Sequence, residues 1–169
     1  MYKKTLLVSL MIFASVNVSA EGAYFGTSIG QAEVDISGLQ SATSFSLTAG
    51  YEVTRNIALE VAYVDLGSVE VSGAPFTLST DGLNFSAVAA LPVHEKVDVF
   101  AKLGFFRWDF SVDESGAGEV FSDDGTDMSY SVGATANLTE QFDAVLEYQV
   151  FEWDGDEISN VSLGAKFSF

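Results

Sequence analysis

The segment MSYSVGATANL, residues Met128–Leu138, indicates the class of fold most clearly. Apolar side chains occupy its even positions, and small or polar side chains occupy its odd positions. A period of two places these two sets on opposite faces of a β-strand. In a soluble sandwich the second face would be charged and turned to water, but here it is small and hydrophilic. The pattern is therefore typical of a strand that faces lipid on one side and a polar lumen on the other.

The same alternation recurs along the chain and predicts eight strands. The clearest further segments span residues 45–53, 83–91, 97–105, 142–150 and 161–169, and residues 24–32 and 57–66 alternate less cleanly. Each segment reaches the roughly 9–11 residues with which a tilted strand crosses a membrane. We therefore predict an all-β fold, an eight-stranded antiparallel up-and-down transmembrane β-barrel, over residues 21–169.

The connections between these segments alternate in length. Residues 54–56, 92–96 and 139–141 are short connections, residues 33–42, 67–77 and 111–125 are longer ones, and residues 154–157 are a short connection on the longer side. Transmembrane barrels have short periplasmic turns and longer extracellular loops. Both chain ends are then periplasmic. An even number of strands lets the first strand pair with the last, so that no edge is expected.

The N-terminal residues have the composition of a secretory signal peptide. The basic start Met1–Lys4 precedes the apolar residues 5–18 and the small-residue exit Val18-Ser19-Ala20. We predict that residues 1–20 are a signal peptide cleaved after Ala20; the alternative is an uncleaved amphipathic anchor. The predicted location is the outer membrane of a Gram-negative cell, as an integral protein.

The composition narrows the function. Without the predicted signal, five basic residues remain against 24 acidic ones, a net charge of −19. Nucleic-acid binding requires a basic surface, so this class is excluded. With 48% hydrophobic and 13% aromatic residues, the chain is not disordered. It has no cysteine, so its stability must come from closure of the sheet and not from disulfides.

Several short motifs, taken in order and with their spacing, resemble the OmpA-type outer-membrane β-barrel domain. They are Tyr24-Phe25-Gly26 with Ile29-Gly30, Ala49-Gly50-Tyr51, Leu59–Tyr63 with Asp65-Leu66-Gly67, Phe100–Gly104, Leu146–Gln149 and the closing Ser162–Phe169. The resemblance implies eight strands and a lumen crossed by charged side chains. It also implies assembly by periplasmic chaperones and the outer-membrane insertion machinery. That machinery reads a C-terminal strand ending in aromatic residues, here Phe167 and Phe169.

The chain departs from that family in two respects. Fused members carry a peptidoglycan-binding domain after the barrel, and none is expected here because the sequence stops at Phe169. A basic residue often lies two positions before the glutamate of the seventh strand, where this chain has Val145. The charged network of the lumen is therefore expected to be thinner.

Four charged residues have the parity of the lumen face: Glu60, Lys102, Glu147 and Lys166. An eight-stranded barrel is just wide enough for its side chains to fill, and a buried charge must be paired or hydrated. The cluster is therefore interpreted either as a structural polar plug, which the narrow width favours, or as a salt-bridge gate in a pore. A last hairpin that turns near Gly155-Asp156 predicts a cross-strand pair of Glu147 with Lys166, for which Lys102 could compete.

The remaining polar residues do not form a recognisable active site. His94, the only histidine, lies in a short turn without a nucleophile beside it, so no enzyme is predicted. Ten acidic residues gather toward the last two outer connections: Asp109, Asp113, Glu114, Glu119, Asp123, Asp124, Asp127, Asp154, Asp156 and Glu157. They are interpreted as a solvated surface in preference to a divalent-cation site linking to lipopolysaccharide phosphates, because residues 123–127 lack EF-hand spacing. No cofactor or metal is expected.

Arg107 has the parity of the lipid face near the outer end of its strand. Close to the membrane interface it would cost only ~0–1 kcal/mol and could meet lipid phosphate. The alternative is a local bulge at Phe105-Phe106 that turns it inward.

The leading functional hypothesis is a structural or surface-interaction protein, which supports envelope integrity or acts like an adhesin through its outer connections. A narrow, low-conductance pore is the alternative, and an outer-membrane lipid-modifying enzyme is the least favoured. The expected partners are outer-membrane lipid and lipopolysaccharide. The sequence identifies no surface ligand.

Overall fold

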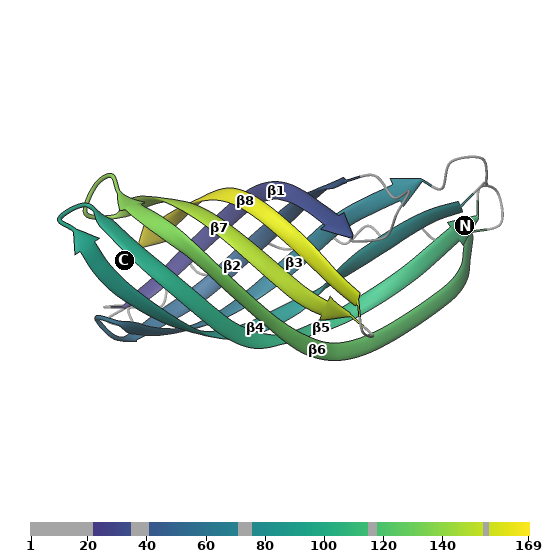
Figure 1. Ribbon diagram of the computed structural model, residues 1–169, viewed down its shortest axis with the longest axis horizontal. Helices are drawn as coiled ribbons and strands as arrows, with labels where there is room; N and C mark the ends of the chain where they lie inside the picture. Colours follow the sequence, from purple (N-terminus) through teal and green to yellow (C-terminus); the bar gives the residue numbers. More distant parts are fainter. Residues whose placement is uncertain (1–21, 35–40, 71–75, 115–117, 154–155) are drawn as a thin grey trace.

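The chain forms a closed ring of antiparallel strands in the computed structural model (Figure 1). The structure describes residues 22–34, 41–70, 76–114, 118–153 and 156–169. The strands are β1 (Ala23–Val34), β2 (Ala42–Thr54), β3 (Ile57–Glu70), β4 (Phe76–His94), β5 (Val97–Glu114), β6 (Gly118–Asn137), β7 (Phe142–Trp153) and β8 (Asp156–Ser168). Each strand pairs with the next, and β1 pairs with β8 to close the ring. The predicted eight-stranded antiparallel up-and-down barrel is confirmed.

One end of the barrel, which we call the turn end, carries the short turns. Residues 55–56 join β2 to β3, residues 95–96 join β4 to β5, and residues 138–141 join β6 to β7. We call the opposite end the outer end. The predicted signal peptide at residues 1–20 and its cleavage after Ala20 lie outside the described residues. Among the described residues, no helix is long and apolar enough to cross a membrane.

The two faces of the ring differ as the alternation predicts. Outward side chains are apolar and exposed; Leu103, Val132 and Leu163, for example, are 58%, 58% and 61% exposed. Their neighbours in sequence point into the lumen, and Ser131 and Ser162 are buried there. An apolar outer band around a more polar interior is the arrangement of a barrel whose solvent is lipid.

Three strands are several residues longer than the others. β4, β5 and β6 contain 19, 18 and 20 residues, whereas the remaining strands contain 12–14, and Figure 1 shows them running past the tips of β7 and β8. The prediction of long loops at residues 67–77 and 111–125 is therefore wrong for most of their length. In these segments apolar residues no longer alternate regularly with polar ones, but the backbone ladder continues. We call residues 65–70, 76–81, 109–114 and 118–127 the outer sheet.

A row of aspartates crosses the outward surface where the outer sheet begins. Asp65, Asp81, Asp109 and Asp124 lie directly opposite one another on β3, β4, β5 and β6. Like charges directly opposite in a sheet repel, and unpaired carboxylates are very costly in lipid. The row therefore lies in water and marks the limit of the apolar band, so the outer sheet projects into solvent.

Arg107 stays on the outward face, one step below the aspartate row. It lies opposite Leu83 on β4 and Thr126 on β6, and its side chain is exposed. The β5–β6 register shows no shift from Val97 to Val112. The alternative of a bulge at Phe105-Phe106 that turns Arg107 inward is therefore wrong.

Candidate functional site

The lumen contains a compact ion triad from three strands. Nζ of Lys102 on β5 lies 2.7 Å from Oε2 of Glu60 on β3 and 3.0 Å from Oε2 of Glu147 on β7. The three side chains are only 10–13% exposed. Two hydroxyl groups satisfy the other carboxylate oxygens: Tyr24 donates to Oε1 of Glu60 at 2.7 Å, and Ser131 donates to Oε1 of Glu147 at 2.6 Å. Each carboxylate thus has a cation and a hydroxyl donor.

Glycine on β2 allows Tyr24 to reach this triad. Tyr24 on β1 lies opposite Gly50, and Gly50 lies opposite Glu60 on β3. A Cβ atom at Gly50 would collide with the Tyr24 ring. The ring therefore lies across β2, and its hydroxyl crosses one strand to bind the carboxylate of the next. A similar contact places the Phe100 ring over Gly133.

Lys166 does not belong to the triad. Its Nζ lies 3.2 Å from Oδ2 of Asp143 and 3.9 Å from Oε1 of Glu52. The predicted pair of Glu147 with Lys166 is wrong, because Glu147 lies opposite Ser162 and Lys166 opposite Asp143. The last hairpin is tighter than predicted: Trp153 already pairs with Asp156, which moves the partner of Glu147 by four residues.

Two apolar clusters enclose the triad along the barrel axis. On β3, β5 and β7 the residues two positions toward the turn end are apolar: Ala58, Phe100 and Val145. They belong to or pack against an inner cluster, which comprises Tyr24, Ala58, Val88 and Phe100 with Ala90 and Val145. Toward the outer end lies an outer cluster, which comprises Ala32, Ala62, Val64, Leu66, Phe106, Trp108, Phe151 and Ile158 with Phe110. The charges therefore lie between two apolar layers.

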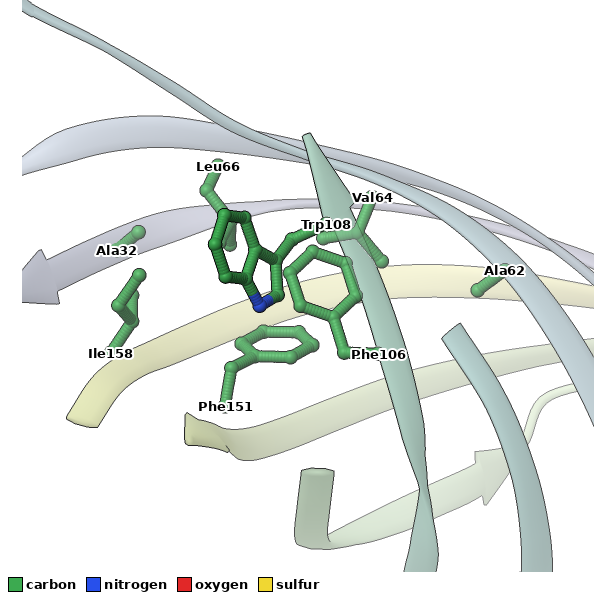
Figure 2. Packing of buried hydrophobic residues seen from close by; sticks show 8 residues of the cluster. All are labelled: Ala32, Ala62, Val64, Leu66, Phe106, Trp108, Phe151 and Ile158. Carbon is green, nitrogen blue, oxygen red and sulfur yellow. The ribbon is translucent and has the colours of Figure 1, made fainter. Parts of the chain in front are cut away.

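The outer cluster fills the lumen with aromatic rings. Figure 2 shows the rings of Phe106, Trp108 and Phe151 gathered together. Phe106 and Phe151 are each 1% exposed, and their ring centroids lie 4.5 Å apart. Nε1 of Trp108 donates to Oδ2 of Asp127 at 2.7 Å, which ties the cluster to the base of the outer sheet. Sequence reasoning missed this cluster, although all three rings have lumen parity.

Two small cavities lie beside the triad. Their volumes are about 80 and 50 Å³, and Tyr24, Glu60 and Lys102 line both. Such volumes hold a few water molecules. None of the lining residues belongs to the outer cluster. The outer cluster therefore separates these cavities from the outer end.

The remaining predicted site residues lie apart from the triad. Phe169 is 59% exposed on the outward face, and the Phe167 ring lies edge-on to Phe142 and Phe169 at 5.0 and 5.1 Å. They lie where β7, β8 and β1 meet, and their role in assembly stays a prediction. His94 ends β4, is exposed and accepts a hydrogen bond from the backbone N–H of Lys96 at 3.4 Å.

The acidic residues of the outer end lie mostly in strands and not in loops. Seven of the ten belong to β5 and β6, two belong to β8, and Asp154 lies outside the described residues. The described residues include no group of three or more His, Asp or Glu side chains placed to hold a metal ion.

A closed barrel with an apolar outer band and a packed lumen defines an integral protein of the bacterial outer membrane. The chain belongs to the outer membrane protein beta-barrel domain family, whose pattern matches residues 5–169. The resemblance found in the sequence is thus confirmed for the family. Among curated proteins, none matches this sequence.

Solved structures of low sequence identity share the fold. Ail, the attachment invasion locus protein of Yersinia pestis, is 18% identical with a TM-score of 0.63, covering 88% of this chain and 99% of Ail. The N-terminal barrel of Pseudomonas aeruginosa OprF is 13% identical with a TM-score of 0.64, covering 86% and 97%. The outer membrane enzyme PagL is 12% identical with a TM-score of 0.52, covering 86% and 99%. At these identities the likeness concerns the fold alone, which serves enzymes as well as other proteins.

Proposed function

We propose that the ring is a closed membrane anchor and that the outer sheet is a surface that binds partners outside the cell. The observation that carries this proposal is the strand pairing that continues beyond the aspartate row, with one register shift between Val112 and Asp113 in the β5–β6 pair. From Asp109 to Glu114 and from Asp124 to Gly118, β5 and β6 remain paired. This amounts to about 15–20 Å of sheet. Anchoring in lipid does not require it, whereas ordered structure projecting from a rigid scaffold is suited to binding.

The packing of the lumen supports an anchor in preference to a pore. The outer cluster lies between the cavities beside the triad and the outer end. The lysine of the triad has carboxylates on two sides, and both carboxylates have hydroxyl donors. A satisfied buried network rigidifies its surroundings. We therefore assign Glu60, Lys102 and Glu147 the role of a structural plug.

The charge of the outer sheet indicates which ligands it would repel. Ail, which shares the fold, has been solved in complex with sucrose octasulfate, a heparin analogue. This chain has no Lys or Arg from Trp108 to Ala165, a stretch that includes its longest outward hairpin. A polysulfated ligand would be repelled there, so the proposed partner carries positive charge.

The test compares cells that display the full chain with cells that display a shortened variant. In the variant, Asn-Gly replaces residues 111–122, so that β5 and β6 join beyond the Phe110–Asp123 pair, whose β6 member directs its N–H and C=O groups toward β5. We expect the full chain to increase adherence to surfaces coated with cytochrome c, a basic protein, and not to serum albumin, an acidic one. The shortened variant should lose this increase while still folding in the membrane. Equal adherence of both would overturn the proposal, and a stable conductance of the full chain in planar bilayers would favour the pore.

A further inference from the structure

The outer sheet has an open edge along β6. β6 pairs with β5 from Gly118 onward, but it pairs with β7 only from Ser129. Between Phe121 and Asp127 no described strand lies on its other side. Figure 1 shows this part of β6 running along the margin of the molecule, beyond the tips of β7 and β8. Sheet edges of this kind are templates for pairing with another extended chain.

The opposite edge of the outer sheet, on β3, is blunted. β3 pairs with β2 as far as Asp65, and the register with β4 then shifts before Ser68. Gly67 between them has a φ of +82°, and its N–H donates to Oδ1 of Asp65 at 2.8 Å. A bulge of this kind bends a strand and prevents continuous pairing. By contrast, the β5–β6 register is unbroken from Phe121 to Ala136, so the two edges are not equivalent.

The hydrogen bonds at the turn end of β6 show which of its backbone N–H and C=O groups face the open edge. The N–H of Asn137 donates to the carbonyl of Lys96, on the β5 side, and the N–H of Leu138 donates to the carbonyl of Phe142, on the β7 side. Along an antiparallel strand these directions alternate from residue to residue. Even-numbered residues of β6 therefore direct their N–H and C=O groups away from β5. At the open edge these residues are Ser122, Asp124 and Thr126, which are all exposed.

The charges at this edge select its occupant. Asp123 and Asp124 are exposed on the open segment, and Asp109 lies opposite Asp124 on β5. A second copy of this chain would place aspartates beside aspartates, which is destabilising. A strand rich in lysine or arginine would gain both backbone hydrogen bonds and opposite charges.

From the register and the charge together, we propose that residues 121–127 of β6 bind an extended, basic segment of another protein by β-strand addition. This inference rests on the proposed function and names the partner of the same surface. The alternative, in which the aspartates only protect the edge from pairing, predicts charge attraction without any requirement for backbone hydrogen bonds.

The experiment measures binding of a fluorescent peptide, four repeats of Lys-Val, to the protein in phosphatidylcholine nanodiscs. Thr126→Pro removes a free N–H that does not face β5, and Thr126→Ala is the matched control that keeps it. Because proline cannot donate and its ring blocks the approaching strand, we expect Thr126→Pro to weaken binding about tenfold, whereas Thr126→Ala changes it less than about twofold. Heat-modifiable gel mobility checks that both variants fold.

If Thr126→Pro does not fold, the unaltered protein is tested instead with a Lys-Val peptide that is N-methylated at alternate residues. This peptide should bind about tenfold more weakly than the unmethylated one, because it lacks the N–H groups that pair with the edge.

Several results would overturn the inference. Equal binding by Thr126→Pro and Thr126→Ala, or by the N-methylated peptide, would mean that only charge attracts the peptide. Equal binding of a Glu-Val peptide, or dimerisation of the protein through this edge, would contradict the basic partner. If the shortened hairpin abolishes adherence of cells but Thr126→Pro does not, the outer sheet binds partners by another surface. If neither change affects adherence, the proposed function itself fails.

Discussion

The ring and the outer sheet are formed by continuous strands, yet their charges are arranged in opposite ways. In the ring every strand has a neighbour on both sides, and Lys102 lies between two carboxylates. Among the described strands, β6 has only β5 beside it in the outer sheet, and four aspartates lie directly opposite one another. Repulsion of that kind is tolerated in water and not in a lumen. The difference indicates that the ring contributes most of the stability, and it is the arrangement expected if the outer sheet has the binding role proposed above.

The largest expected effect comes from removing the cation of the triad. Lys102→Met leaves Glu60 and Glu147 buried without a cation, although each keeps its hydroxyl donor, so we expect the free energy of unfolding to fall by about 3 kcal/mol. Urea unfolding in lipid vesicles measures it. Lys96→Met, in an exposed turn, is the matched control and should change stability by less than about 0.5 kcal/mol. A loss for Lys102→Met no larger than in this control would show that the two carboxylates are hydrated.

A smaller effect is expected when one carboxylate of the triad is neutralised. After Glu147→Gln, Lys102 still contacts Glu60, so the loss should be about 1–2 kcal/mol. A double-mutant cycle of Lys102→Met with Glu147→Gln should give a coupling energy of about 0.5–3 kcal/mol. A second cycle, of Lys166→Gln with Glu147→Gln, should give a coupling energy of zero, because Lys166 pairs with Asp143 and not with Glu147. Coupling of equal size in both cycles would mean that the β7–β8 register is wrong.

The smallest effect is expected at the aspartate row. Asp124→Asn removes repulsion with Asp109 and should stabilise the outer sheet by about 0.2–1 kcal/mol, more at low salt. Asp123→Asn removes the same charge from a position opposite Phe110 and is the matched control. Slower amide exchange on β5 and β6 of the outer sheet measures the gain. If Asp123→Asn slows exchange equally, net charge and not the row is responsible.

The sequence predicted the faces of the strands but neither their ends nor their register. Alternation at Ser131 and Val132 is visible because lipid requires apolar outward side chains. Beyond Asp109 water is on both faces, so the pattern no longer separates strand from loop. The alternation shows that Glu60, Lys102 and Glu147 face the lumen, but it does not predict that they contact one another. They lie 42 and 45 residues apart in the sequence and meet only across the closed ring. The aspartate row depends on the register of four strands, which no single segment reveals.

The central claim, a closed ring continued by a sheet with one open edge, is tested most directly by residue-resolved amide hydrogen exchange on β6 in nanodiscs. In the ring, amides from Tyr130 to Ala136 should all exchange slowly, because β5 and β7 bind alternate residues. In the outer sheet, Asp123 and Gly125 should exchange at least about tenfold more slowly than Ser122, Asp124 and Thr126, whose N–H groups face away from β5. Uniform protection from Ser122 to Thr126 would show that the edge is covered, and uniformly fast exchange there would show that the outer sheet is not formed; either result would contradict the account.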